Sequence, residues 1–257
     1  MFLARRSRVE ELCRALVQNR LNRMYKWTCS ARASSVDENI LRQMRKAGCI
    51  YIIYGFESGS QRMLDAMNKK TTVEQNYRAV VLTKKAGILI NSAFIVNLPG
   101  EEEPDILATI EFIKRTKVYT ANLNNLMPLP GSAYYREFLD RGIVTHSETL
   151  WDEIGVLPES FENIRLYNDI SSDRFVQLCE EAKSIIWDIN IRNYIRVNWY
   201  RDPRYCLENA ISLIGRFFAG KKGTATYLVA QRLYRSMKGT LKKVLKEVRN
   251  RWRREQG

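Results

Sequence analysis

The sequence predicts an α/β protein whose strands form a parallel sheet. Strand-like and helix-like patterns alternate through the first 145 residues, and one strand with its helix takes roughly 25–40 residues. Glycine or proline follows most of these segments. This order is typical of right-handed βαβ units, in which each helix returns the chain to the start of a neighbouring parallel strand.

The expected helices are indicated by apolar residues three or four positions apart and by signals at their ends. Ser35 and Glu38 have the spacing of a capping box, and Gly48 is expected to end the helix that they begin. The other helices are expected over residues 6–18, 61–67, 72–86 and 104–116, and from Ser132 to Gly142.

Four segments have strand patterns, namely residues 25–31, 50–54, 89–98 and 120–127. Residues 50–54 are a continuous apolar run, which predicts a strand buried on both faces. Asparagine recurs in the last two strands, at positions 91, 97, 122, 124 and 125. Buried amides need hydrogen-bond partners. These side chains therefore either line a wet or ligand-filled interior or lie at strand ends on the surface.

The pattern changes after residue 145, so we expect two parts: a βα part over residues 1–145 and a helical extension over residues 146–257. Within the extension, residues 150–168 are expected to be irregular, and residues 172–196 and 207–219 to be helical. Residues 224–254 have the pattern of a long basic amphipathic helix.

The chain has 257 residues, with 42 Lys and Arg against 28 Asp and Glu, which gives a net charge of +14. Residues 1–50 carry 11 basic and 4 acidic side chains, and residues 201–257 carry 15 and 4, so the excess lies at the two ends. Such a charge bears on partners and not on the fold. The helix expected over residues 224–254 is either a solvated face or a surface for an anionic membrane or nucleic acid.

No run of about 18 apolar residues occurs, and the first residues do not resemble a secretory signal. Five scattered cysteines, at positions 13, 29, 49, 179 and 206, argue against a disulfide framework and for a reducing compartment. We therefore expect a protein that is cytoplasmic, or peripheral to the membrane.

Ligand sites of parallel sheets form at the carboxyl ends of the strands. Residues 55–60, Gly-Phe-Glu-Ser-Gly-Ser, follow one strand, but their glycine spacing fits neither the dinucleotide fingerprint nor the P-loop. A carboxylate there suits ribose hydroxyls, and an ordinary turn is the alternative. Residues 98–101, Leu-Pro-Gly-Glu, are open to the same two explanations. His146, the only histidine, lies away from the strand ends, which argues against a Ser-His-Asp hydrolase.

Taken together in this order, the motifs resemble the radical S-adenosylmethionine (SAM) superfamily, and most closely the group in which a cobalamin-binding domain precedes the radical SAM barrel. The resemblance covers about residues 5–145 and is carried by an ordered set of segments: residues 27–32, 37–41, 48–49, 55–60, 67–69, 86–88, 94–101 and 128–132. It implies a partial (βα) barrel of six parallel strands, of which this chain carries the third to the sixth, followed by an α-helical extension.

The resemblance also implies the residues of a SAM site. Glu57 and Ser58, at the end of the family's fourth strand, would contact the ribose and methionine parts of SAM. Ile95 and the segment Asn97-Leu98-Pro99-Gly100 would pack on the adenine, although the family usually has glycine at the position of Asn97. Met127 and Pro128, after the sixth strand, would close over the adenine.

The chain departs from the family at its start. The family holds a four-iron four-sulfur cluster with a Cys-x3-Cys-x2-Cys loop after its first strand, and no such spacing occurs here. Three thiolates are the minimum anchor for such a cluster. We therefore expect a truncated or split gene product, in which the cluster loop, two strands and any cobalamin domain belong to a missing N-terminal half.

The predicted function is accordingly that of the C-terminal part of a radical SAM enzyme, which would use SAM, the cluster and, through the missing domain, cobalamin. Its intact relatives carry out methyl transfer, cyclisation or ring rearrangement, and the sequence does not indicate the small-molecule substrate. One alternative is a non-catalytic scaffold that keeps the half-barrel and uses the basic helix to bind a membrane surface or nucleic acid. Another is an ordinary α/β enzyme without a metal.

Overall fold

The structure is a computed structural model that describes residue 3 and residues 5–143 and 166–198. The chain divides into two compact units, residues 1–186 and residues 187–257. Residues 150–165 of the irregular segment predicted over residues 150–168 lie outside the described residues. So do the helices predicted over residues 207–219 and 224–254. The boundary predicted between residues 145 and 146 falls in the same undescribed stretch and stays a prediction.

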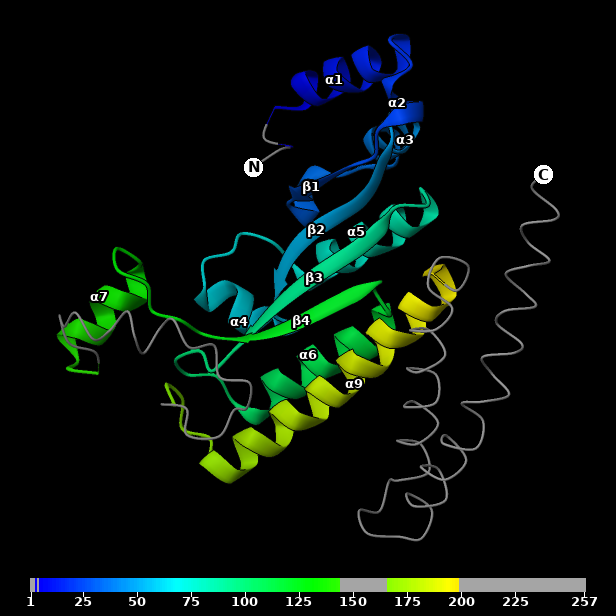
Figure 1. Ribbon diagram of the computed structural model, residues 1–257. Coiled ribbons are helices and arrows are strands. Elements are labelled where there is room, and N and C mark those ends of the chain that lie inside the picture. The colour runs from blue at the N-terminus through cyan, green and yellow to red at the C-terminus, as the bar shows by residue number, and fades with distance from the viewer. Residues whose placement is uncertain (1–2, 4, 144–165, 199–257) are drawn as a thin grey trace, which may run out of the picture. The chain divides into compact units, whose positions relative to one another are not determined.

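The first unit contains a parallel four-stranded sheet with the order β1-β2-β3-β4 (Figure 1). The strands are β1 Trp27–Ala31, β2 Cys49–Glu57, β3 Leu89–Val96 and β4 Thr120–Asn125. Helices connect each strand to the next: α3 Glu38–Lys46, then α4 Gln61–Ala66 with α5 Val73–Lys85, then α6 Glu103–Thr116. The predicted α/β class with a parallel sheet is confirmed.

Helices α1 Arg6–Gln18 and α2 Leu21–Met24 precede the sheet. Helix α1 has the predicted bounds, and it buries Val9 and Cys13. The capping box predicted for the next helix is wrong. Asp37 caps α3 by accepting a hydrogen bond from the backbone N–H of Ile40, whereas Ser35 lies in a short 3-10 helix and donates its hydroxyl to the carbonyl of Arg32. Asp37 lies two residues after Ser35, and it directly precedes the first helical turn.

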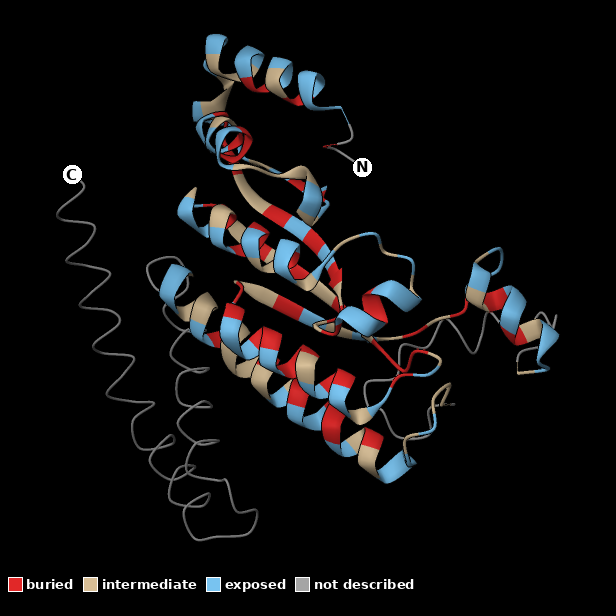
Figure 2. Ribbon diagram, turned by 180° about the vertical axis from the view of Figure 1, so that it is seen from behind, coloured by how far each residue is buried: buried red, intermediate tan, exposed pale blue. Residues whose placement is uncertain are grey.

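The strands bury one face, and Figure 2 shows from behind how α5 and α6 lie over that face. In β2 the side chains of Ile52, Tyr54 and Phe56 are fully buried, whereas Ile53 between them is 38% exposed. The prediction that this strand is buried on both faces is therefore wrong. Within the described residues the helices cover one side of the sheet, so an apolar run does not by itself show a second covering layer.

Two apolar clusters fix the later helices. Helix α9 Ser172–Asn198, which confirms the helix predicted over residues 172–196, packs its first turns against α6 through Phe175, Leu178 and Ile110. Helix α7 Ala133–Asp140 packs Tyr135 and Phe138 against the carboxyl ends of the strands. None of the described helices has the length and apolar character needed to cross a bilayer.

Candidate functional site

The three predicted loops lie together at one edge of the sheet, because the carboxyl ends of parallel strands share an edge. Glu57 at the end of β2 is in register with Phe94 of β3, and Val96 is in register with Asn125 of β4. The backbone N–H of Leu126 donates to the carbonyl of Val96 over 2.9 Å, which extends this pairing into the loop before Met127. We call this region the carboxyl-edge site.

Glu57 is the first component of the site. Its backbone has a φ of 66°, at an irregularity in the pairing of β2 with β3. Its Oε1 lies 2.5 Å from Lys69 Nζ, and the side chain of Glu57 is 16% exposed. A Cβ atom at Gly55 would collide with this carboxylate. Glycine at position 55 thus gives the carboxylate room to lie along the open face of the strand.

Ser58 has a different environment from Glu57. It is fully buried, and its hydroxyl lies 3.2 Å from Thr109 Oγ1 of α6 and accepts a hydrogen bond from the backbone N–H of Ser60. Thr109 Oγ1 also accepts a hydrogen bond from Gly59 N. The Ser58 side chain therefore ties the loop to α6 and does not point to the edge where Glu57 lies.

Glu101 holds the loop after β3 in place. Its carboxylate is 2% exposed and accepts hydrogen bonds from the backbone N–H groups of Asn97, at 2.6 Å, and Leu98, at 3.3 Å. Burial raises the pKa of Glu101 to about 7, and the negative charge of Asp105 acts in the same direction. The two backbone hydrogen bonds and the charge of Arg62 oppose this rise.

Asn97 occupies a left-handed backbone conformation, with a φ of 69°. Glycine adopts this conformation without strain, and asparagine is the residue that most often replaces it. The Asn97 amide donates to Asn125 Oδ1 over 2.9 Å and accepts from the backbone N–H of Tyr167 over 2.7 Å. The side chain thus links three segments of the chain by hydrogen bonds that a glycine could not make.

The rest of the loop offers apolar surface and backbone groups. Leu98 is buried among Met63, Leu126 and Phe138, and Ile95 packs against the same cluster. Pro99 is half-buried, and Gly100 is exposed with a φ of 68°. Met127 and the buried Pro128 follow β4 at the same edge, so the structure brings the predicted adenine residues together.

An ion pair beneath this loop was not predicted from the sequence. Arg62 of α4 pairs with the buried carboxylate of Asp105 and also donates to the carbonyl of Gly100 over 2.9 Å. Ser60 donates to the same carboxylate over 2.6 Å. Burial acts to raise the pKa of Asp105, but the hydrogen bonds from Arg62 and Ser60 hold it below its usual range. Ser60 and Arg62 are 45 and 43 positions away from Asp105 in the sequence, so no local pattern predicts this pairing.

Lys69 belongs to the motif at residues 67–69, but the sequence alone did not indicate a role for it. Asn68 and Lys70 on either side of it have positive φ values of 51° and 49°. Two such residues around one lysine mark a tightly turned segment. That turn brings the Lys69 ammonium to Glu57.

The recurrent asparagines divide between two places. Asn122 and Asn124 are exposed on the face of the sheet that the described helices leave open, and Asn122 donates to Asn91 Oδ1 over 3.2 Å. On the same face, Tyr51 Oη lies 2.5 Å from Thr120 Oγ1. Asn97 and Asn125 pair at the carboxyl edge. The amides therefore form a polar open face and a strand-end pair, and they are not part of a packed apolar core.

The described cysteines do not fit an iron–sulfur cluster. Among the described residues, no group of three or more His, Cys, Asp or Glu side chains is placed to hold a metal ion. Cys13, Cys29, Cys49 and Cys179 are all buried. Burial raises the pKa of Cys13 to about 11 and that of Cys179 to about 12, whereas a cluster ligand must be a thiolate.

Comparison with known proteins shows which family part of the chain is similar to. Residues 3–113 match the model of the radical SAM superfamily. An uncharacterized methyltransferase of Pyrococcus horikoshii is 33% identical over 106 residues, which are 41% of this chain and 23% of the relative. The anaerobic magnesium-protoporphyrin IX monomethyl ester cyclase of Rubrivivax gelatinosus is 33% identical over 138 residues, which are 53% of this chain and 24% of the relative.

Among solved structures, the radical SAM methyltransferase TsrM from Kitasatospora setae, with cobalamin and a [4Fe-4S] cluster bound, has a TM-score of 0.42 at 19% identity. The match covers 46% of this chain and 25% of that one.

Residues 3–113 of this chain are thus similar to the radical SAM superfamily. Its relatives include methyltransferases and a cyclase, and the matched segment spans about a quarter of their length.

Proposed function

We propose that residues 27–135 form the ribose- and adenine-binding side of a SAM pocket in a radical SAM enzyme of the methyltransferase or cyclase type. The observation that carries this proposal is the meeting of three loops at the carboxyl edge, where a partly accessible carboxylate lies beside two apolar strand-end turns. Parallel α/β sheets bind nucleotide-like ligands at this position.

The ribose would be held by Glu57. A carboxylate accepts hydrogen bonds from vicinal hydroxyls, and charge-assisted hydrogen bonds of this kind are stronger than neutral ones. Lys69 orients this carboxylate. The Ser58 side chain, which is already bonded to Thr109 and Ser60, would contribute its backbone and its support of the loop.

The adenine would lie against Ile95 and the turn formed by Leu98, Pro99 and Gly100. The Glu101 carboxylate occupies the N–H groups of Asn97 and Leu98, so these two groups shape the turn and do not bind the base. Met127 and Pro128 would cover the other side of the ring. Apolar surfaces with a few backbone hydrogen-bonding groups are typical of such pockets.

The cluster and cobalamin would have to be held by residues outside those assigned here, because the described cysteines do not fit the cluster. A bound cluster supplies the electron that cleaves SAM. The contribution of the described residues is to bind SAM and to orient its nucleoside part.

The second candidate is a non-catalytic half-barrel with a basic segment for membranes or nucleic acid. The absence of a metal-holding group among the described residues favours it. SAM binding separates the two candidates, since the scaffold has no reason to bind SAM.

Isothermal titration calorimetry of the full chain with SAM tests the proposal. The Glu57→Ala variant should bind SAM at least about tenfold more weakly, which corresponds to the loss of one charge-assisted hydrogen bond. Glu111→Ala, an exposed substitution on α6, is the matched control. Equal affinities of the Glu57→Ala variant and the unmodified chain would overturn the ribose assignment, and no binding by either would favour the scaffold.

A further inference from the structure

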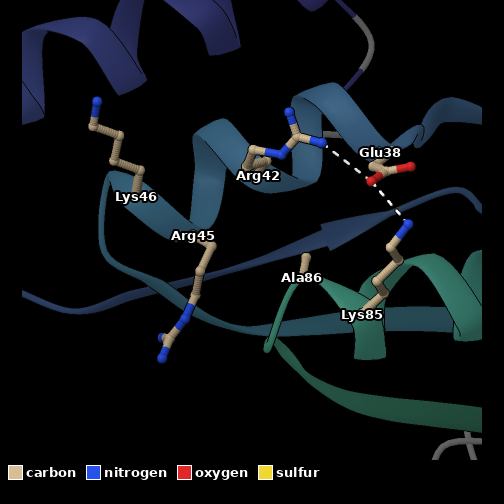
Figure 3. Close-up of a pocket in the computed structure, with 6 residues that line it drawn as sticks. All are labelled: Glu38, Arg42, Arg45, Lys46, Lys85 and Ala86. Carbon is tan, nitrogen blue, oxygen red and sulfur yellow. Dashed lines mark hydrogen bonds and ion pairs between the residues drawn. The ribbon is translucent and has the colours of Figure 1, made fainter.

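A basic pocket lies at the opposite edge of the sheet from the carboxyl-edge site. It has a volume of about 420 Å³ and is lined by Glu38, Arg42, Arg45, Lys46, Lys85 and Ala86 (Figure 3). Helix α3 ends at Lys46 just before β2 begins, and α5 ends at Lys85 just before β3 begins. The pocket therefore lies where these strands start.

The lining of this pocket is strongly positive. Four of its described side chains are cationic, and Glu38 is the one carboxylate among them. Figure 3 shows Arg42 and Lys85 both reaching Glu38, and the distances are 3.1 Å and 3.0 Å. The side chains of Arg42 and Lys85 remain 72% and 65% exposed. The single carboxylate is thus shared, and the pocket keeps a net positive charge that is open to solvent.

Helix α2 and the residues that follow it also carry exposed positive charge. Asn22 Nδ2 donates to the carbonyl of Lys46 over 2.9 Å, so this segment lies against the end of α3. Arg23 and Lys26 are exposed there, and the Tyr25 side chain between them is 60% exposed. We define the basic edge as Arg23, Tyr25, Lys26, Arg42, Arg45, Lys46 and Lys85.

Helix stability accounts for part of this pattern. Arg45, Lys46 and Lys85 lie in the last turns of α3 and α5, where cations are favoured by the helix dipole. That effect leaves the charges in solvent and able to bind. It does not account for an exposed tyrosine between two further cations.

We propose that the basic edge binds single-stranded nucleic acid. Exposed cations around an open pocket suit the successive phosphates of a nucleic-acid backbone. An exposed aromatic ring beside them suits stacking of an unpaired base. A helix that lies in a membrane surface buries a broad apolar face, whereas Met24 is the exposed large aliphatic side chain next to Tyr25. The proposal is independent of the SAM pocket.

Binding of a fluorescein-labelled oligouridylate and the matching oligothymidylate to the full chain, followed by anisotropy over a range of salt concentrations, is the first test. Arg45→Gln/Lys46→Gln/Lys85→Gln should lower the slope of log affinity against log salt by about 2, since each phosphate contact contributes about 0.7. Arg8→Gln/Arg78→Gln/Arg136→Gln removes the same charge from exposed positions outside the basic edge. Equal slopes for the two triple variants would overturn the proposal.

A second measurement locates the strand directly and does not depend on the folding of a variant. An oligonucleotide containing 5-bromouridine is crosslinked to the unmodified chain by ultraviolet light, and the attached peptides are identified by mass spectrometry. Attachment at Tyr25 is expected, and the Tyr25→Ala variant should bind about tenfold more weakly through loss of stacking.

Crosslinks confined to residues 201–257, which carry the other basic segment, would overturn the proposal. So would binding of the chain to phosphatidylserine vesicles that the Arg45→Gln/Lys46→Gln/Lys85→Gln variant loses while its oligonucleotide binding is unchanged.

Discussion

Glu101 accepts a 2.6 Å hydrogen bond from the backbone N–H of Asn97, four residues earlier in the same loop. The contact closes the turn between β3 and α6 onto itself. Because the carboxylate is buried, the shape of the proposed adenine surface depends on a group that titrates near neutral pH. The consequences of this arrangement can be measured.

The first prediction concerns pH. The folded chain raises the pKa of Glu101 from 4.5 to about 7, so between these values the folded state binds more protons than the unfolded state. The contribution of Glu101 to the free energy of unfolding should therefore fall as pH rises through this window, by on the order of 3 kcal/mol. Urea unfolding at several pH values measures it.

Glu101→Gln should remove this part of the pH dependence, and the exposed substitution Glu111→Gln should leave it in place. A carboxyl carbon resonance of Glu101 that titrates near pH 4.5 would contradict the prediction.

The second prediction concerns Asn97. Asn97→Ala loses the amide's hydrogen bonds and keeps a Cβ at a positive φ, so it should destabilise the fold by about 2–3 kcal/mol. Asn97→Gly loses the same hydrogen bonds but relieves the backbone strain, and its cost should be about 1 kcal/mol smaller. Urea unfolding compares the two variants. Equal losses would show that the left-handed conformation carries no strain.

The third prediction concerns Arg62. Arg62→Ala removes the ion pair with Asp105 and the hydrogen bond to Gly100, and it leaves a buried carboxylate with one fewer partner. Since such a carboxylate is costly, the free energy of unfolding should fall by about 2 kcal/mol. Arg78→Ala, on the exposed face of α5, is the control, and thermal unfolding is the measurement. If the two variants have the same melting temperature, Asp105 is stabilised by Ser60 and the backbone alone.

The fourth prediction separates positioning from stability at Lys69. Lys69→Ala should lower the affinity for SAM about threefold to tenfold, because the Glu57 carboxylate loses the partner that orients it. Lys69→Arg should restore most of this affinity. Both variants should unfold within about 1 kcal/mol of the unmodified chain, since a partly exposed ion pair contributes little. A loss of stability without a change in affinity would assign Lys69 a structural role only.

Local signals predicted much of the fold. The helix over residues 6–18 follows from its apolar spacing, and the helices that end near Gly48 and Gly87 follow from glycines at positive φ. The prediction that β2 is buried on both faces was wrong, because an apolar run does not indicate which face the helices cover. The choice of Asp37 over Ser35 as the cap depends on where the chain leaves the short 3-10 helix.

The site could be predicted only in part. Glu57, the loop over residues 97–100 and Met127 were placed correctly at one edge, because strand ends can be read from periodicity. The partners that fix them are distant in sequence, as with Asp105 and Ser60 or Asn97 and Tyr167. Such pairs arise from the packing of α6 and of the segment before α9, which no local pattern encodes.

The measurement that bears most directly on the proposed SAM pocket is photolabelling of the full chain with an 8-azidoadenosyl analogue of SAM, with the labelled peptides identified by mass spectrometry. Attachment is expected within residues 95–100 and 127–128. It should be suppressed by excess SAM and reduced in the Glu57→Ala variant. Attachment elsewhere, or labelling within these residues that excess SAM does not suppress, would contradict the proposed pocket.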